Sequence, residues 1–393
     1  MDPDLEGSEC LNFSTDIFGN YNFSENDMPP LPALETGHVI KIVFYAAVFI
    51  GSLVGNVGVI VIVATSRRMR SAITAYLVNL AAADISILLL CMWVHLVQDI
   101  SRHRHYPLGA FWCRFNGFAQ MTALTASVLT LTAIACDRFV AVMFPLRARR
   151  SQTGRRVGII IAGIWVVSMA AALPLLIHRH LLEIQWKNAI EYSCQDNWPT
   201  TYEYSEEAGG CLLTQKYKHM YQTLVAVALF FAPIAVMGGA YTLIVWRLWL
   251  SPFPSQGMES QIHQSNGSKK RVVKMVVLVM VVFVLCWLPL QVISLYSMFA
   301  IDTGHSAPPY WFESVHFLAY FMAYSNSLWN PILYGGFNAS FRQGFVRLFL
   351  CRRPSFSRRF SRSRDKNGYT AALVHLMPHH GTSSRRTQMT TVR

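Results

Sequence analysis

Residues 272–299 read VVKMVVLVMVVFVLCWLPLQVISLYSMF, and no charged side chain follows Lys274 in this stretch. A run of about 18 or more apolar residues is long enough to cross the hydrocarbon core of a bilayer as a helix. Because a backbone in lipid must satisfy its own hydrogen bonds, we expect this stretch to be helical. Pro289 lacks a backbone N–H and is expected to kink the helix.

Six other long stretches of the chain have the same apolar character. One such stretch is compatible with a buried helix of a soluble domain, but seven in one chain argue against that alternative. The composition agrees, because 53% of the residues are hydrophobic and only 14% are charged, whereas soluble domains carry about 25% charged residues. The sequence therefore predicts an all-α membrane protein, a seven-transmembrane helix bundle with spans at 38–64, 73–97, 111–142, 157–176, 220–249, 272–299 and 311–334.

The distribution of charge predicts the orientation of the bundle. Residues 1–40 hold eight acids and no Lys or Arg, whereas the tail after residue 351 is rich in Arg. Cytoplasmic loops carry an excess of basic residues, and an odd number of spans places the two termini on opposite sides. We expect a multi-pass protein of the plasma membrane with its N-terminus outside and its C-terminus inside. The loops after spans one, three and five support this with Arg67, Arg68, Arg70, Arg147, Arg149, Arg150, Arg155, Arg156, Arg247, Lys269, Lys270, Arg271 and Lys274.

The segments that flank the bundle have their own signatures. Asn12 and Asn22 begin glycosylation sequons. Cys351 lies beside two arginines after an amphipathic stretch and is a predicted palmitoylation site. A basic tail beside a membrane favours anionic lipid over nucleic acid as its partner. The predicted regions are an extracellular, glycosylated, acidic N-terminus (1–37), the seven-transmembrane domain (38–336), an amphipathic membrane-surface helix (337–351) and a disordered, basic cytoplasmic tail (352–393).

Four of the eight cysteines are predicted to lie outside the cell, where disulfides form. Cys113 begins the third span, and Cys194 lies in the long acidic loop at 178–219. A bond between them would hold this loop over the mouth of the bundle. Cys10 and Cys211 remain as a second predicted pair.

Each span carries a short motif, and the motifs follow one another in a known order. With them the chain resembles the rhodopsin-like (class A) family of G-protein-coupled receptors over about residues 38–351. The resemblance implies a receptor rather than an enzyme, with a heterotrimeric G protein, arrestin and receptor kinases as partners. The motifs are Gly55-Asn56, Asn79 to Asp84, Asp137-Arg138-Phe139, Trp165, Pro233 with Tyr241, Phe283 with Cys286-Trp287-Leu288-Pro289, and Asn330-Pro331-Ile332-Leu333-Tyr334.

The resemblance assigns roles to polar and aromatic residues inside the spans. An ionisable residue within a span is functional by default, and the family holds a sodium ion at such an acid, with no other cofactor implied. The alternative is a neutral, hydrogen-bonded Asp that ties helices together. The implied sodium pocket comprises Asp84, Asn56, Ser127, Asn326 and Asn330. The implied activation switch comprises Val128, Pro233, Phe283, Trp287, Pro289, Tyr241 and Tyr334, and G-protein coupling falls to Asp137, Arg138 and Phe139, where Phe replaces the usual Tyr.

Two positions narrow the class of ligand. A retinal protein needs a Lys where this chain has Tyr324, and an amine receptor needs an Asp where it has Gln120. With Gln120 at this position the chain instead resembles the peptide-binding branch of the family, which includes neuropeptide Y, neuropeptide FF and orexin receptors. The stretch from Cys194 to Pro199 is similar to RFamide-type and neuropeptide FF receptors, and Tyr334 to Asn338 is similar to invertebrate neuropeptide receptors.

The acidic outer segments would attract a basic peptide, so the predicted ligand is a basic peptide, with a C-terminally amidated peptide as one candidate. Ordinary solvation is the alternative explanation for each surface acid. The predicted ligand contacts are Asp99, Gln120, Glu191, Asp196, Gln291, Tyr320 and Tyr324. A receptor of this fold for a non-peptide ligand is one alternative function. A transporter is another, but the sequence has no evident internal repeat. An intramembrane enzyme lacks support, since the spans hold no paired metal-binding residues and no nucleophile motif.

Overall fold

A computed structural model describes residues 27, 36–66, 69, 71–101, 106–146, 148, 153–205, 210–247, 259–301 and 309–350. The chain divides into a unit of Met1–Arg352 and a tail of Arg353–Arg393, and all described residues belong to the first unit. Asn12, Asn22, Cys10 and Cys351 lie outside the described residues, so the predicted modifications and the second disulfide stay predictions.

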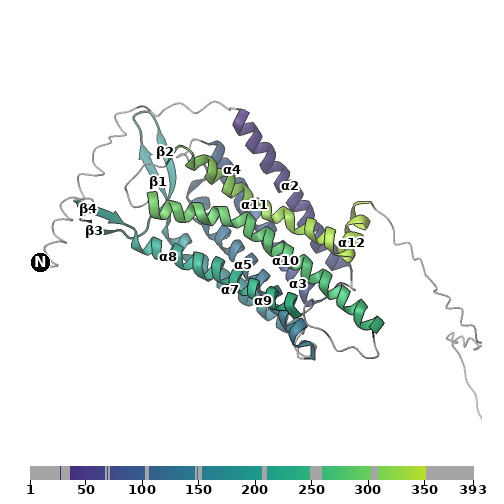
Figure 1. Ribbon diagram of the computed structural model, residues 1–393. Coiled ribbons are helices and arrows are strands. Elements are labelled where there is room, and N and C mark those ends of the chain that lie inside the picture. Colours follow the sequence, from purple (N-terminus) through teal and green to yellow (C-terminus); the bar gives the residue numbers. More distant parts are fainter. Residues whose placement is uncertain are drawn as a thin grey trace, which may run out of the picture. The chain divides into compact units, whose positions relative to one another are not determined.

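Long helices run side by side through this unit (Figure 1). Their bounds match the predicted spans closely, except that the sixth helix begins at Glu259 rather than near residue 272. The helices are α2 (Thr36–Thr65), α3 (Ala72–Ile87) continued by η3 (Leu88–Met92) and α4 (Trp93–Ile100), α5 (Gly109–Met143), α7 (Gly154–His178), α8 (Lys216–Ala226) continued by η4 (Val227–Phe231) and α9 (Ala232–Val245), α10 (Glu259–Tyr296) continued by η6 (Ser297–Ile301), and α11 (Phe312–Phe337).

Among the described residues, six helical segments are long and apolar enough to cross a membrane, and α11 is not one of them. Its polar residues explain the difference. Asn326, Ser327 and Asn330 are each at most 3% exposed, because α11 packs against α10 and α2 and turns these side chains into the bundle. The polarity of α11 therefore faces protein rather than lipid, which explains why hydropathy alone does not select this helix.

Two β-hairpins form the long loop after α7, which the sequence indicated only as an acidic lid. Strand β1 (Arg179–Gln185) pairs antiparallel with β2 (Ile190–Asp196), and β3 (Thr201–Ser205) pairs with β4 (Gly210–Thr214). The predicted disulfide between Cys113 and Cys194 is confirmed, and it ties β2 to the first turns of α5. We call this the hairpin end of the bundle, and the opposite end, where α5 finishes near Arg138, the basic end.

A short amphipathic helix, α12 (Ala339–Phe349), follows α11 at the basic end (Figure 1). Asn338 caps its N-terminus, because its side-chain oxygen accepts a hydrogen bond from the Ser340 backbone N–H at 3.0 Å. Phe341 is buried against Tyr334 of α11, whereas Phe349 is exposed. The predicted helix after the seventh span is therefore confirmed, with an apolar face turned toward the bundle.

Candidate functional site

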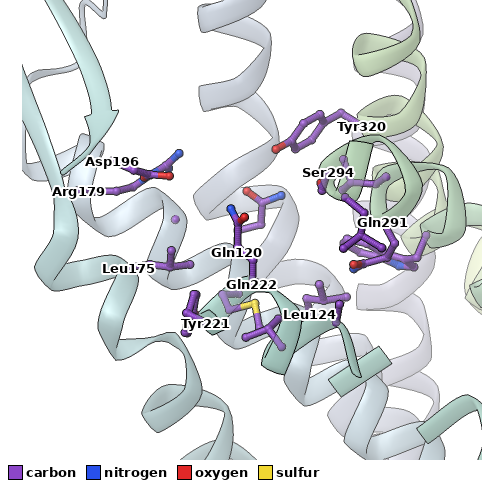
Figure 2. A pocket seen from close by; sticks show the side chains of 17 residues that line it. Gln120, Leu124, Leu175, Arg179, Asp196, Tyr221, Gln222, Gln291, Ser294 and Tyr320 are labelled. Carbon is purple, nitrogen blue, oxygen red and sulfur yellow. The ribbon is translucent and has the colours of Figure 1, made fainter. Parts of the chain in front are cut away.

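A cavity of about 220 Å³ lies between α5, α7, α8, α10 and α11, beneath the β1–β2 hairpin. Three glutamine side chains, Gln120, Gln222 and Gln291, contribute amide groups to its wall (Figure 2). Trp287 also lines it, on the side away from the hairpin. The cavity therefore combines neutral hydrogen-bonding groups with an apolar wall, which is the usual composition of a ligand site.

The charged groups of this cavity form an ion pair. Arg179 Nε donates a hydrogen bond of 2.9 Å to Asp196 Oδ1, and both side chains line the cavity. Burial lowers the pKa of the Arg179 guanidinium, but the charge of Asp196 and this hydrogen bond outweigh burial and leave the pKa above its ordinary value. The two residues face each other as the first pair of the β1–β2 ladder. The cavity thus presents a neutralised pair rather than a free carboxylate.

Close packing against α5 fixes the position of the Arg179 guanidinium. A Cβ atom added at Gly117 would lie 2.9 Å from Arg179 Nη1 and 3.1 Å from its Cδ. A larger residue at this position would make the Arg179 side chain shift. Sequence reasoning missed both residues, because nothing in the local pattern shows that the start of β1 returns over α5.

Gln120 joins the cavity to a layer of aromatic rings. Its Oε1 lies 3.0 Å from His95 Nε2, and the His95 ring packs on Tyr320 with centroids 4.5 Å apart. Tyr320 lines the cavity, whereas Tyr324 is fully buried, 5.6 Å from the His95 ring, and is absent from the cavity wall. Figure 2 shows Gln120 between the Arg179–Asp196 pair and Tyr320. Four of the predicted ligand residues, Gln120, Asp196, Gln291 and Tyr320, therefore meet at one cavity.

The other two predicted acids lie elsewhere and already have partners. Asp99 Oδ2 lies 3.2 Å from Lys41 Nζ, and this ammonium group also lies over the Phe317 ring. Glu191 is 2% exposed and accepts a hydrogen bond of 2.7 Å from the Trp186 indole. The sequence does not show these partners, so it predicted that both acids would face the ligand. In the structure neither Asp99 nor Glu191 lines the cavity.

A second polar cluster lies deeper in the bundle, around Asp84. This fully buried carboxylate accepts hydrogen bonds from Ser327 Oγ at 3.0 Å and Asn330 Nδ2 at 2.8 Å. Asn56 Nδ2 donates to the Ser327 carbonyl at 2.9 Å. The Oδ1 atoms of Asn56 and Asn326 are buried and have no hydrogen-bond partner among the described residues. Carboxylate and amide oxygens are the type of ligand that a hard cation such as sodium takes.

Not every predicted member of the cluster has the same place in it. Ser127 is buried, but its hydroxyl donates to the Ala123 carbonyl of its own helix at 3.0 Å. Ser327, which sequence reasoning did not single out, contacts Asp84 directly. Its position one residue after the predicted Asn326 is the signal that could have found it.

The predicted switch residues form a connected path below the cavity. The ring of Phe283 lies 6.2 Å from that of Trp287 and 6.3 Å from that of Phe230. Val128 is buried in the same core, Pro233 lies in the first turn of α9, and Pro289 lies inside α10. A displacement of Trp287 by a ligand would therefore press directly on this packed core.

The basic end holds one ion pair and two buried tyrosine hydroxyls that lack a hydrogen-bond partner among the described residues. Arg138 forms an ion pair with the neighbouring Asp137, and the Phe139 ring contacts Phe144. The hydroxyl groups of Tyr241 and Tyr334 are buried without a hydrogen-bond partner in the described part of the chain. An unpaired buried hydroxyl costs free energy, so both tyrosines would gain from a new polar contact.

The fold defines a helical bundle with membrane-spanning character and two internal polar sites, and comparison with known proteins gives its family. The model of the family described as "7 transmembrane receptor (rhodopsin family)" matches residues 55–334. The chain belongs to this family, so the resemblance to class A G-protein-coupled receptors is confirmed. The family consists of signalling receptors rather than enzymes, and it makes α11 the seventh span.

Its relatives include receptors named for peptides. The chain is 33% identical to the substance-P receptor of Aquarana catesbeiana over 307 residues, which cover 78% of this chain and 69% of the relative. It is 29% identical to a QRFP-like peptide receptor of Branchiostoma floridae over 356 residues, 86% of this chain and 87% of the relative. The substance-P receptor of Rattus norvegicus is 31% identical over 343 residues, with 87% and 78% covered.

Proposed function

We propose that this chain is a receptor for an extracellular peptide, which it binds at the hairpin end to activate a heterotrimeric G protein at the basic end. One observation carries the proposal: Trp287 lines the cavity and also contacts Phe283 in the core of α10. A ligand that fills the cavity therefore touches a residue of α10, the helix that contains Pro289. The names of its relatives, which include substance-P and QRFP-like peptide receptors, support a peptide as ligand.

The part of the peptide that enters the cavity is a carboxamide, either a C-terminal amide or a side-chain amide. Three glutamine amides supply both donors and acceptors, and a carboxamide has the matching pair of groups. The Arg179–Asp196 pair is neutral overall, so it favours neither a free carboxylate nor an ammonium group. The cavity is smaller than the roughly 300–1,000 Å³ of sites that enclose a whole small molecule. The remaining peptide, including any basic residues, therefore lies nearer the acidic outer segments.

A comparison of matched peptides tests this proposal. Neuropeptides in amidated and free-acid form are applied to cells that express the chain, and calcium and cyclic AMP are read together. We expect amidated forms to be about 5- to 150-fold more potent, because an unpaired buried polar group costs about 1–3 kcal/mol. Equal potency of the two forms would refute a C-terminal amide in the cavity, and unchanged potency when side-chain amides of the peptide are replaced by carboxylates would refute a side-chain amide. An ion flux in liposomes without G-protein activation would favour a transporter.

Asp84 and its neighbours hold an allosteric sodium ion in the inactive state. On activation Tyr241 and Tyr334 turn toward Arg138, which leaves Asp137 and contacts the G protein. The unpaired oxygens near Asp84 and the unpaired tyrosine hydroxyls support these assignments. Arrestin and receptor kinases act on the tail.

The orientation is N-terminus outside and C-terminus inside at the plasma membrane, as the loop charges favour. Epitope tags at the two ends should therefore be accessible on opposite faces of intact cells. The modifications that accompany this orientation are glycans at Asn12 and Asn22 and an acyl chain at Cys351.

A further inference from the structure

A second cavity lies at the basic end, between α2 and α12. Its volume is about 670 Å³, and it has both polar and apolar walls. The last turn of α2 and the residue after it contribute Thr65 and Ser66, and α12 contributes Ser340, Gln343, Arg347 and Leu348. It belongs neither to the ligand cavity nor to the cluster around Asp84.

The two helices that form this cavity approach each other closely. A Cβ atom added at Gly344 would lie 2.5 Å from Ile62 Cγ2, and one added at Gly58 would lie 2.8 Å from the Phe345 ring. These contacts leave little freedom for α12 to slide along α2. The walls of the cavity are therefore set by packing before any ligand arrives, which lowers the entropic cost of binding.

The polar groups around the cavity are suited to phosphate. The Arg347 guanidinium is a lining group that matches phosphate oxygens. Ser66, Ser340 and Gln343 add further hydrogen-bonding groups. The hydroxyl of Thr65 already donates to the Val61 carbonyl at 2.8 Å, so it offers acceptors only.

The chain segments that form the walls of the cavity carry no acidic residue. The sequence holds no Asp or Glu at residues 36–83 or 314–364, which include both helices that form the walls. Arg67, Arg68 and Arg70 directly follow the lining residue Ser66 in the chain, and Arg352 and Arg353 follow α12. Such a run of positive charge without acids favours an occupant with several negative charges.

Apolar residues place this cavity at the lipid surface. Leu348 lines it, and the neighbouring Phe349 and Leu350 are exposed on the same helix. An amphipathic helix with exposed Phe and Leu lies in the interface of a bilayer. A soluble polyanion would gain nothing from such a wall, whereas a lipid can place its headgroup in the cavity and its acyl chains beside it.

We propose that the cavity between α2 and α12 binds the headgroup of a phosphoinositide of the inner leaflet. Arg347 pairs with a phosphate, and the hydroxyl and amide groups contact the inositol ring and its oxygens. The site depends on the orientation proposed above, which places the basic end inside the cell. Phe341 of α12 contacts Tyr334 of α11, so a bound headgroup that holds α12 against α2 also supports the end of the seventh span.

The test uses the purified full-length receptor in phosphatidylcholine nanodiscs that contain a labelled phosphatidylinositol bisphosphate. Energy transfer from receptor to lipid reports binding, with phosphatidylserine at matched total charge as the comparison lipid. Arg347→Gln should weaken phosphoinositide binding about tenfold or more, because it removes charge-assisted hydrogen bonds to a phosphate. Arg342→Gln is the matched control, since Arg342 is exposed on the same helix and does not line the cavity, and it should cost no more than the roughly fivefold general value of a basic residue near the membrane.

The variant Ser340→Asp distinguishes a loss of lipid binding from a loss of receptor stability. An acid near the N-terminus of a helix is favourable, so the melting temperature of this variant should be equal or higher. A carboxylate in the cavity should nevertheless repel phosphate and reduce binding at least as much as Arg347→Gln. Unchanged binding in Ser340→Asp contradicts the proposal.

Other outcomes also overturn the proposal and identify the occupant instead. Equal losses in the Arg347 and Arg342 variants indicate diffuse attraction to a basic surface. Equal binding of phosphatidylserine indicates that no headgroup site exists. Displacement by soluble inositol trisphosphate as readily as by short-chain lipid indicates a free polyanion. Binding that appears only after thioesters are cleaved indicates that an acyl chain of the receptor itself fills the cavity.

Discussion

Exchange of Asp196 for Asn breaks the Arg179–Asp196 pair and leaves a guanidinium without its carboxylate. The two side chains are 29% and 25% exposed, and their contact is 2.9 Å. Exposed ion pairs contribute about 0–1 kcal/mol, and removal of one partner from a fully buried pair costs about 3–5 kcal/mol. For a pair that is about one quarter exposed, we expect a cost of about 1–3 kcal/mol, or about 5- to 150-fold in peptide affinity.

A double-mutant cycle measures this interaction. Asp196→Asn, Arg179→Gln and the double variant are compared in peptide displacement assays, normalised to the number of receptors at the cell surface. We expect both single variants to weaken binding, and the double variant to lose less than the sum by about 1–2 kcal/mol, since the two residues act together. Glu183→Gln serves as a control, because Glu183 lies exposed on the same hairpin and away from the cavity.

One result would refute this reasoning. If Asp196 paired directly with a basic residue of the peptide, Arg179 would compete for the same carboxylate. Arg179→Gln would then strengthen binding of a basic peptide while Asp196→Asn weakened it. Changes of opposite sign in the two single variants would therefore show that the pair opens when the ligand binds.

Three further changes test the rest of the assignment. Asp84→Asn should abolish the effect of sodium on agonist affinity, because it removes the charge of the buried carboxylate; an unaltered sodium titration would favour the role of tying helices together. Arg138→Ala should abolish agonist-stimulated nucleotide exchange on the G protein at normal surface expression, and retained exchange would exclude Arg138 from coupling. Loss of the disulfide through Cys113→Ser with Cys194→Ser should cost about 2–5 kcal/mol, and an unchanged Tm of the purified receptor would contradict its structural role.

The sequence by itself determined the bundle and the places of its motifs. A bilayer demands apolar helices of a minimum length, so the spans can be read from hydrophobic runs without knowledge of their neighbours. The approximate places of the motif residues can then be predicted, because each residue has a known helix and a known depth in the membrane. Asp84 meets Asn330, as the family resemblance implied, and Cys113 meets Cys194, as their places at the start of the third span and in the long loop led us to expect.

Only the tertiary structure decided which polar groups are paired. Three contacts depend on how separate elements pack: the ion pair of Arg179 with Asp196, the ion pair of Lys41 with Asp99, and the hydrogen bond of Ser327 to Asp84. The period of a helix or strand tells which residues share a face, but it does not tell which residue of another element stands opposite. Asp99 and Asp196 are therefore each paired with a basic side chain of the receptor itself, because packing brings Lys41 and Arg179 beside them.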